Sequence, residues 1–273
     1  MSALRSCGIS MEHDTAVAGK TNSKEHTHAF HEIYFLVSGK RRYLMRDTIY
    51  DVAPGELVFV PREQLHCTTS VTKAGYHRYA VYFDRRQESL FASLVGQTAI
   101  DTLLHSGCMR LPEEASAHLH RDLEQLQRIL EEPGALTFAM ATHVLQDILL
   151  TALRHGIPKQ PYCGESANKI QLVAHYITEH YSNPITLSSA ARLACMEETY
   201  FSRKFRELTG FSFLDYLTRQ RLLEARRLLR ETNLSIGQIA DSCGFSGANY
   251  FGDVFLRRYG MSPSAYRKEQ YKS

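Results

Sequence analysis

The stretch that decides the fold of the C-terminal part is residues 234–268, LSIGQIADSCGFSGANYFGDVFLRRYGMSPSAYRK. Ser235 is a typical N-cap, and the apolar residues after it predict a short amphipathic helix that ends at a glycine-containing turn. A second helix is predicted over residues 247–259 and ends at Gly260, since Gly is the preferred residue directly after a helix. Two short helices joined by a tight turn are typical of a helix-turn-helix, whose second helix can enter the major groove of DNA.

The same pattern occurs a second time upstream. The matched positions lie 49 residues apart in the first helix and 50 residues apart after the turn. The pairs are Leu187 with Ile236, Ala191 with Ala240, Tyr200 with Tyr250, Phe201 with Phe251, Phe205 with Phe255, Gly210 with Gly260, Ser212 with Ser262 and Tyr216 with Tyr266. Two motifs in register indicate a DNA-binding domain far more strongly than one motif does.

In each second helix the apolar residues are expected to point inward and the polar ones outward. Tyr250, Phe251, Val254 and Phe255 form the predicted inner face of the second motif. The predicted DNA-binding residues are Thr199, Ser202, Arg203 and Arg206 in the first motif and Ala248, Asn249 and Asp253 in the second. An arginine can bond guanine O6 and N7 together, and an asparagine can read adenine.

These paired motifs, each followed by Gly-x-Ser and a Tyr, resemble the AraC/XylS family of bacterial transcription regulators. The resemblance covers the last 105 or so residues closely and the rest of the chain more loosely. In family members, positions matching Thr199, Ser202 and Arg203 contact bases. Family members commonly have Ser-Arg where this chain has Gly252 and Asp253, so the first motif is expected to dominate specificity. Cys195 stands where the family has Gly, which predicts a slightly strained turn.

Charge is divided unevenly along the chain. Residues 168–273 contain 15 Lys and Arg against 10 Asp and Glu, a balance of +5, whereas the remainder contains 17 against 19. A basic C-terminal half fits nucleic-acid binding confined to one domain. The alternative is an all-helical interaction domain that never touches DNA.

The first 110 or so residues have a different pattern, made of short apolar runs separated by turn signals. Runs rich in Tyr, Val, Ile and Phe occur at 33–39, 41–47, 48–55, 56–61 and 77–83. Such runs read as β-strands, and several at this spacing predict an antiparallel barrel or jelly roll.

Two segments of this part follow the cupin motifs. His26-Thr-His28-x3-Glu32-x6-Gly39 matches the first, and Gly55-x5-Pro61-x4-His66 matches most of the second, with Glu63 where cupins favour Gly. In metal-binding cupins the residues matching His26, His28, Glu32 and His66 hold a divalent ion, and these ligand types suit one. The alternative is that they line an effector pocket. His31 is one residue out of phase, so it is expected to point away and to have a structural or surface role.

An effector pocket in the barrel is predicted to use polar and aromatic side chains that can bond or stack against a sugar-like molecule. The predicted effector-binding residues are His26, His28, Glu32, Arg41, Tyr43, His66 and Tyr82. No cofactor is required by the sequence, and a divalent metal ion in the cupin is the alternative occupant.

Residues 113–156 change to a helical period. Leu119, Leu123, Leu126 and Leu130 form one amphipathic helix, and a second, apolar on most sides, follows the Pro-Gly pair at 133–134.

We expect a two-domain α+β protein. It has a cupin barrel (double-stranded β-helix or jelly roll) at 1–112, dimerisation helices at 113–156, a linker at 157–167 and an all-α double helix-turn-helix domain at 168–273.

The sequence therefore predicts a DNA-binding transcription regulator of the AraC family, an activator rather than an enzyme, that responds to a small molecule such as a sugar. Its expected partners are double-stranded promoter DNA, RNA polymerase, the effector and a second copy of itself. Six scattered cysteines, no signal peptide and no long apolar run favour a cytoplasmic location without membrane contact. A metal-sensing regulator and a bifunctional cupin enzyme remain as alternatives.

Overall fold

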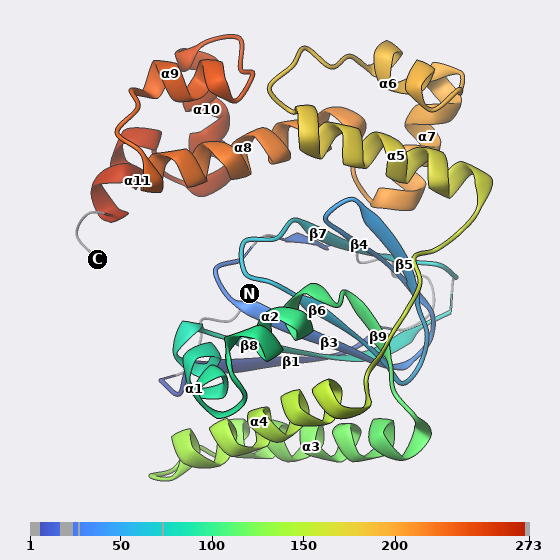
Figure 1. Cartoon of the computed structure of the whole chain (residues 1–273), viewed down its shortest axis with the longest axis vertical. Helices are drawn as coiled ribbons and strands as arrows, with labels where there is room; N and C mark the ends of the chain where they lie inside the picture. The colour runs from blue at the N-terminus through green and yellow to red at the C-terminus, as the bar shows by residue number, and fades with distance from the viewer. Residues whose placement is uncertain (1–5, 17–23, 27, 73, 271–273) are drawn as a thin grey trace. The chain divides into compact units, whose positions relative to one another are not determined.

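The computed structural model describes residues 6–16, 24–26, 28–72 and 74–270. The chain divides into two compact units, with the boundary between residues 162 and 163. The N-terminal unit contains the strands and the first four helices, and the C-terminal unit contains only helices (Figure 1). No helix in the described ranges has both the length and the apolar content that crossing a membrane requires.

Two antiparallel sheets form the N-terminal barrel. The larger sheet has the order β1-β8-β3-β6-β9-β10 and the smaller has the order β2-β7-β4-β5. The strands are β1 (Ile9–Ala16), β2 (Lys24–His26), β3 (His31–Ser38), β4 (Arg41–Met45), β5 (Thr48–Val52), β6 (Glu56–Val60), β7 (His66–Ser70), β8 (Tyr76–Phe83), β9 (Cys108–Arg110) and β10 (Ile157–Pro158). The predicted cupin-like β-rich domain is therefore present.

Alternation along the strands of the larger sheet creates two cores, because successive side chains point to opposite faces. Odd-numbered residues of β3, such as Ile33 and Phe35, pack towards the helices. Even-numbered ones, such as Tyr34 and Leu36, point into the barrel. His31 is also odd-numbered, so its side chain points away from that of Glu32, as predicted, and lies buried against the helical layer.

Four helices cover the outer face of the larger sheet: α1 (Arg85–Val95), α2 (Gln97–His105), α3 (Glu113–Glu131) and α4 (Thr137–His155). α3 and α4 lie side by side beneath the sheet (Figure 1). The sequence prediction placed only barrel in residues 1–112 and missed α1 and α2. α1 begins where the Asp84 carboxylate accepts a hydrogen bond from the amide of Gln87, an N-cap that could have indicated the helix.

The predicted linker at 157–167 is shorter than expected. Ile157 and Pro158 form β10 and pair with β9. The Lys159 ammonium then donates to Glu56, and the amide of Tyr162 donates to the carbonyl of Ile49. Because these bonds attach residues 157–162 to the barrel and α5 begins at residue 165, only the residues between them connect the two units without regular structure.

The C-terminal unit consists of α5 (Glu165–His180), α6 (Leu187–Leu193), α7 (Glu198–Thr209), α8 (Phe213–Glu231), α9 (Ile236–Ser242), α10 (Ala248–Tyr259) and α11 (Pro263–Gln270). Pairs α6–α7 and α9–α10 are the two predicted helix-turn-helix motifs, and the long helix α8 joins them (Figure 1). Phe201 and Phe205 of α7 are fully buried, as are the matching Phe251 and Phe255 of α10. Tyr250 was expected to point inward and is instead half exposed.

The first helix of each motif begins with a reciprocal capping box. Thr186 and Ser189 exchange side-chain and backbone hydrogen bonds in α6, and Ser235 and Gln238 do the same in α9. Thus the two copies share their local structure as well as their sequence.

Two residues that replace glycine still adopt the left-handed conformation. Cys195, between α6 and α7, has φ of 51°, and Glu63, in the second cupin motif, has φ of 61°. The turn at Cys195 is therefore strained as predicted. The loop at Glu63 keeps the positive φ that suits the glycine favoured by cupins, and the Glu63 amide donates to the carbonyl of His28.

Candidate functional site

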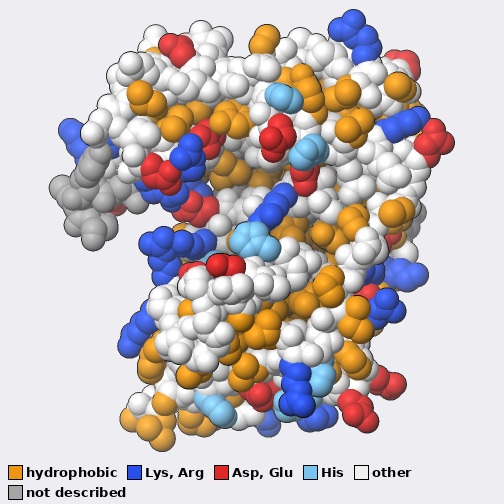
Figure 2. Space-filling view, viewed as in Figure 1, with side chains coloured by type: hydrophobic (Ala, Val, Ile, Leu, Met, Phe, Trp, Pro, Cys, Tyr) orange, Lys and Arg blue, Asp and Glu red, His pale blue; other side chains and the backbone are white. Residues whose placement is uncertain are grey.

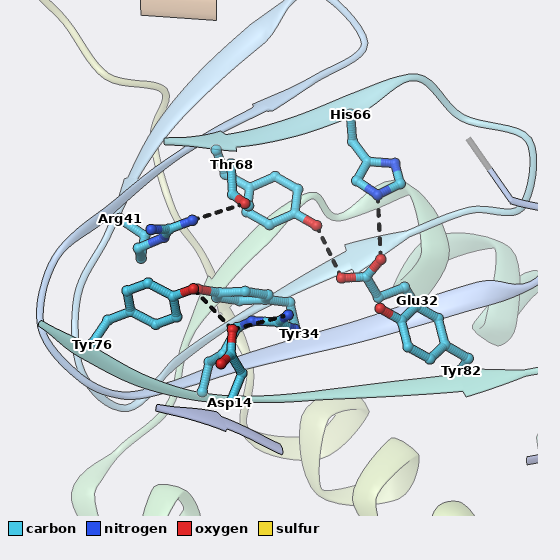
Figure 3. A pocket seen from close by; sticks show the side chains of 10 residues that line it. Asp14, Glu32, Tyr34, Arg41, His66, Thr68, Tyr76 and Tyr82 are labelled. Atoms are coloured by element: carbon cyan, nitrogen blue, oxygen red, sulfur yellow. Dashed lines mark hydrogen bonds and ion pairs between the residues drawn. The ribbon is translucent and has the colours of Figure 1, made fainter. Parts of the chain in front are cut away.

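A recess inside the barrel brings together side chains from both sheets (Figure 3). It is lined by Asp14, Glu32, Tyr34, Arg41, Tyr43, His66, Thr68, Tyr76, Arg78 and Tyr82. Glu32, Arg41, Tyr43, His66 and Tyr82 are five of the predicted effector-binding residues. The side chains fill most of the recess and leave a free volume of about 20 Å³, enough for one water molecule.

Glu32 is the centre of one end of the recess. One carboxylate oxygen accepts from His28 Nε2 at 2.8 Å and lies 3.3 Å from His66 Nε2. The other accepts from the Tyr43 hydroxyl at 3.2 Å. Burial alone would raise the pKa of the Glu32 carboxyl, but the two histidines hold that pKa well below its usual value. Glu32 is therefore a buried anion held by three donors.

The two histidines are oriented by the backbone. His28 Nδ1 lies 2.7 Å from the carbonyl of Phe30, and His66 Nδ1 lies 2.9 Å from the carbonyl of Gln64. Nδ1 of each ring therefore donates to a carbonyl, and both Nε2 atoms face the Glu32 carboxylate, so a ring that also donates to Glu32 is an imidazolium. Burial lowers the pKa of His28, but the Glu32 hydrogen bond and charge outweigh burial and leave that pKa raised.

The same three residues fit a metal ion by geometry. Ligand atoms of His28, Glu32 and His66 lie within 4.8 Å of one another, and all three side chains are buried. Backbone carbonyls on the remote ring nitrogens are the usual outer support of metal-binding histidines. The backbone of His26 pairs with that of His66, but the side chain of His26 lies outside the described part of the structure.

The other end of the recess is built from charged and aromatic groups. Arg41 donates to the Thr68 and Ser70 hydroxyls, and its guanidinium lies 4.1 Å from the centroid of the Tyr76 ring. The Tyr76 hydroxyl donates to Asp14 at 2.9 Å. Such groups can recognise a polar molecule by hydrogen bonds and by stacking.

Sequence reasoning missed half of the lining. The missed residues are Asp14, Tyr34, Thr68, Tyr76 and Arg78. A signal for two of them was present in β8, because Tyr76 and Arg78 share the parity of the predicted Tyr82 and so face the same side of the strand. Asp14 had no comparable signal, since β1 pairs with β8 from more than 60 residues away.

The predicted DNA-reading residues lie along two surface helices. Thr199, Arg203 and Arg206 are exposed on α7, whereas Ser202 is half-buried. On α10, Ala248, Asn249 and Asp253 are all exposed. The predicted set is therefore accessible in both motifs, with Ser202 the least accessible member.

The arginines of α8 are largely paired with neighbours on their own domain. Arg219 bonds Asp215, and Arg227 bonds Glu224 and Glu231. Figure 2 shows the same interspersion of acidic and basic side chains across the face in view. This pairing favours a solvated helix face for α8.

Comparisons with known proteins agree with both halves of the molecule. Residues 16–149 match the family model described as AraC-like ligand binding domain, and residues 190–269 match a helix-turn-helix domain model. The HTH-type transcriptional activator RhaR of Cronobacter sakazakii is 25% identical over 251 residues, covering 90% of this chain and 87% of RhaR. RhaS of Escherichia coli is 26% identical over 265 residues, covering 89% and 87%.

Among solved structures, the DNA-binding domain of AdpA in complex with a target DNA is 36% identical, covers 36% of this chain and 87% of that domain, and has a TM-score of 0.35. The two family matches occupy the barrel with its helices and the two helix-turn-helix motifs, and the relatives are regulators rather than enzymes. The chain belongs to the AraC/XylS family of DNA-binding transcription regulators, with a cupin-like ligand-binding domain at its N-terminal end.

Proposed function

We propose that this protein is a cytoplasmic transcription activator that binds a small polar molecule, a sugar or sugar acid, in the recess of its barrel. The observation that carries this proposal is the lining itself, in which Glu32 at one end, Arg41 at the other and four tyrosines face the same recess. Carboxylates, guanidinium groups and aromatic rings together suit a ligand with many hydroxyls. RhaR and RhaS, which match this chain over most of their length, are HTH-type transcriptional activators.

The ligand must displace side chains in order to bind. Pockets for small molecules are typically 300 Å³ or more, whereas the free volume here is about 20 Å³. Arg41 and Tyr76 close one end of the recess through their own mutual contact. We therefore expect a ligand to take over the hydrogen bonds that Arg41 and Asp14 now make within the protein.

On the DNA side, we propose that α7 and α10 enter adjacent major-groove segments of promoter DNA, with α7 as the main reader. α7 carries two exposed arginines at the predicted positions, whereas α10 carries Asp253, which phosphates repel. The protein acts as a homodimer through α3 and α4 and contacts RNA polymerase when bound. Ligand occupancy shifts the population of the DNA-competent state.

The test is a thermal-unfolding screen of the full chain against sugars, sugar acids and divalent ions, with and without chelator. A ligand present at a hundred times its Kd stabilises the native state by about 2.7 kcal/mol. A sugar that raises the unfolding midpoint in wild type, but not in Arg41→Ala, supports the proposal. A sugar that stabilises both proteins equally places binding elsewhere and contradicts it.

A metal-sensing regulator is the second candidate, and the convergence of His28, Glu32 and His66 favours it. Here the screen gives a hit for a divalent ion alone, and chelator abolishes that hit. In equilibrium dialysis a His28→Ala, His66→Ala double variant would bind one divalent ion fewer per chain than wild type, whereas Arg41→Ala would bind as many, because Arg41 belongs to the opposite end of the recess. A double variant that bound as many ions per chain as wild type would exclude this site.

A further inference from the structure

A second cluster of metal-ligating side chains lies on the helical layer, outside the barrel recess. His118 and Asp122 are four residues apart in α3 and therefore share one helix face. Asp147 projects from the adjacent helix α4. His118 Nε2 lies 3.2 Å from Asp147 Oδ2 and 3.5 Å from Asp122 Oδ2. One ligand atom from each of the three residues lies within 4.8 Å of the other two.

The Asp122 carboxylate points to a missing partner. Asp122 is only 7% exposed, and its Oδ2 atom, the one that faces His118, makes no hydrogen bond within the described ranges. A buried carboxylate oxygen without a hydrogen bond is destabilising. A cation at this point would compensate two carboxylates at once.

The separations match the geometry of one tetrahedral ion. Zinc binds histidine nitrogen and carboxylate oxygen at about 2.0–2.2 Å, so two of its tetrahedral ligands stand about 3.4 Å apart. The observed separations of 3.2 and 3.5 Å from His118 to the two carboxylates bracket that value. The His118 and Asp147 side chains are 44% and 45% exposed, which gives an ion access from solvent and room for a water ligand.

We propose that His118, Asp122 and Asp147 bind a divalent transition-metal ion of the zinc type and thereby link α3 to α4. One imidazole and two carboxylates provide three protein ligands, and water fills the fourth position. Binding replaces the proton on His118 Nε2 with the metal. The site is independent of the recess in the barrel and of any effector that the recess binds.

Zinc binding to the chelator-treated full chain, measured by equilibrium dialysis, tests the site. The key variant is Asp147→Asn, because Asp147 is half exposed and its replacement leaves the core untouched. His155→Ala, an exposed histidine at the end of α4, is the matched control. We expect D147N to bind one zinc ion fewer than wild type and H155A to bind as many. D147N with undiminished zinc stoichiometry and affinity would overturn the proposal.

Two further variants separate this site from the barrel and from a purely structural ion pair. The His28→Ala, His66→Ala double variant keeps the ion assigned to Asp147. In Asp122→Asn, zinc no longer raises the unfolding midpoint, while the zinc-free protein unfolds at or above the wild-type temperature because a buried charge is gone. If zinc raised the midpoint of D122N and D147N as much as that of wild type, the helical cluster would not be a metal site.

Discussion

Glu32 is the buried residue of the barrel on which two histidines and a tyrosine converge. It is 3% exposed, yet it stays ionised because His28, His66 and Tyr43 surround its carboxylate. The resemblance to the two cupin motifs was enough to predict Glu32 and the two histidines, although β3 and β7 lie in different sheets. It could not predict Asp14, because the position of Asp14 in the recess depends on the pairing of β1 with β8, more than 60 residues away.

Glu32→Gln should lower the free energy of unfolding of the N-terminal unit by about 1–3 kcal/mol, since the variant disrupts a buried charged hydrogen-bond network. Urea denaturation in the presence of chelator measures the change. Glu114→Gln, at an exposed position in α3, is the control and should leave the stability unchanged. Equal stability of both variants would show that the Glu32 network contributes nothing to the fold.

Cys195 holds a conformation that suits glycine. Cys195→Gly should raise the free energy of unfolding of the C-terminal unit by about 1 kcal/mol, because it removes the strain of a Cβ at positive φ. The matching residue of the second motif is Gly244, with φ of 76°, and a Cβ there would lie 2.5 Å from the carbonyl oxygen of Ser182. Gly244→Ala should therefore destabilise the same unit, and denaturant unfolding of the two variants compares the two turns.

At the scale of elements, local capping explains why the helix boundaries of the C-terminal unit could be predicted closely. α9 begins at Ile236, directly after the predicted N-cap Ser235, and α10 ends at Tyr259, directly before the predicted Gly260, which is left-handed. Helices α1 and α2 were missed although Ile100, Leu103 and Leu104 of α2 follow a helical period, because both helices are short and follow a long run of strands. Their position depends on packing against the larger sheet, which a local pattern does not record.

Glu197 caps α7, and this cap should depend on pH. The Glu197 carboxylate accepts from the amides of Thr199 and Tyr200, and these hydrogen bonds lower its pKa below the usual 4.5. Its stabilising effect is therefore present above pH 4.5 and is lost as the pH falls through the folded-state pKa. Glu197→Ala should lower the unfolding midpoint at pH 7, and the difference from wild type should shrink towards pH 3. A difference that stayed constant with pH would contradict the charged cap.

At the scale of the whole molecule, the sequence alone was enough to predict a ligand-binding barrel followed by a DNA-binding domain. The duplicated helix-turn-helix motif indicated the DNA-binding domain, and the strand periodicity together with the cupin spacing indicated the barrel. The connection between them was less predictable. Residues 157–162 look like a polar linker in sequence, yet pairing with β9 and the Lys159–Glu56 ion pair attach them to the barrel.

Arg203→Ala and Asp253→Arg should change DNA binding in different ways. Loss of a guanine-reading arginine should relax specificity at one base pair by about 1–3 kcal/mol. Asp253→Arg should instead tighten binding to all sequences and steepen the salt dependence by about one unit of slope. Selection of bound sequences from a random DNA pool, followed by salt titrations, measures both effects. Lys169→Ala, on α5 outside both motifs, is the control, and an unchanged selected sequence for R203A would show that Arg203 is not a base reader.

The tightly filled recess also bears on how quickly the proposed sensor can respond. With space for one water molecule, the recess excludes a sugar until Arg41 and its neighbours swing away. At low ligand concentration the binding rate should grow in proportion to concentration, but at high concentration it should level off at the rate of opening. The apparent affinity is reduced by the fraction of molecules that are open at any moment. The protein would then respond to a sudden rise in its effector at a speed set by its own side chains, however abundant that effector became.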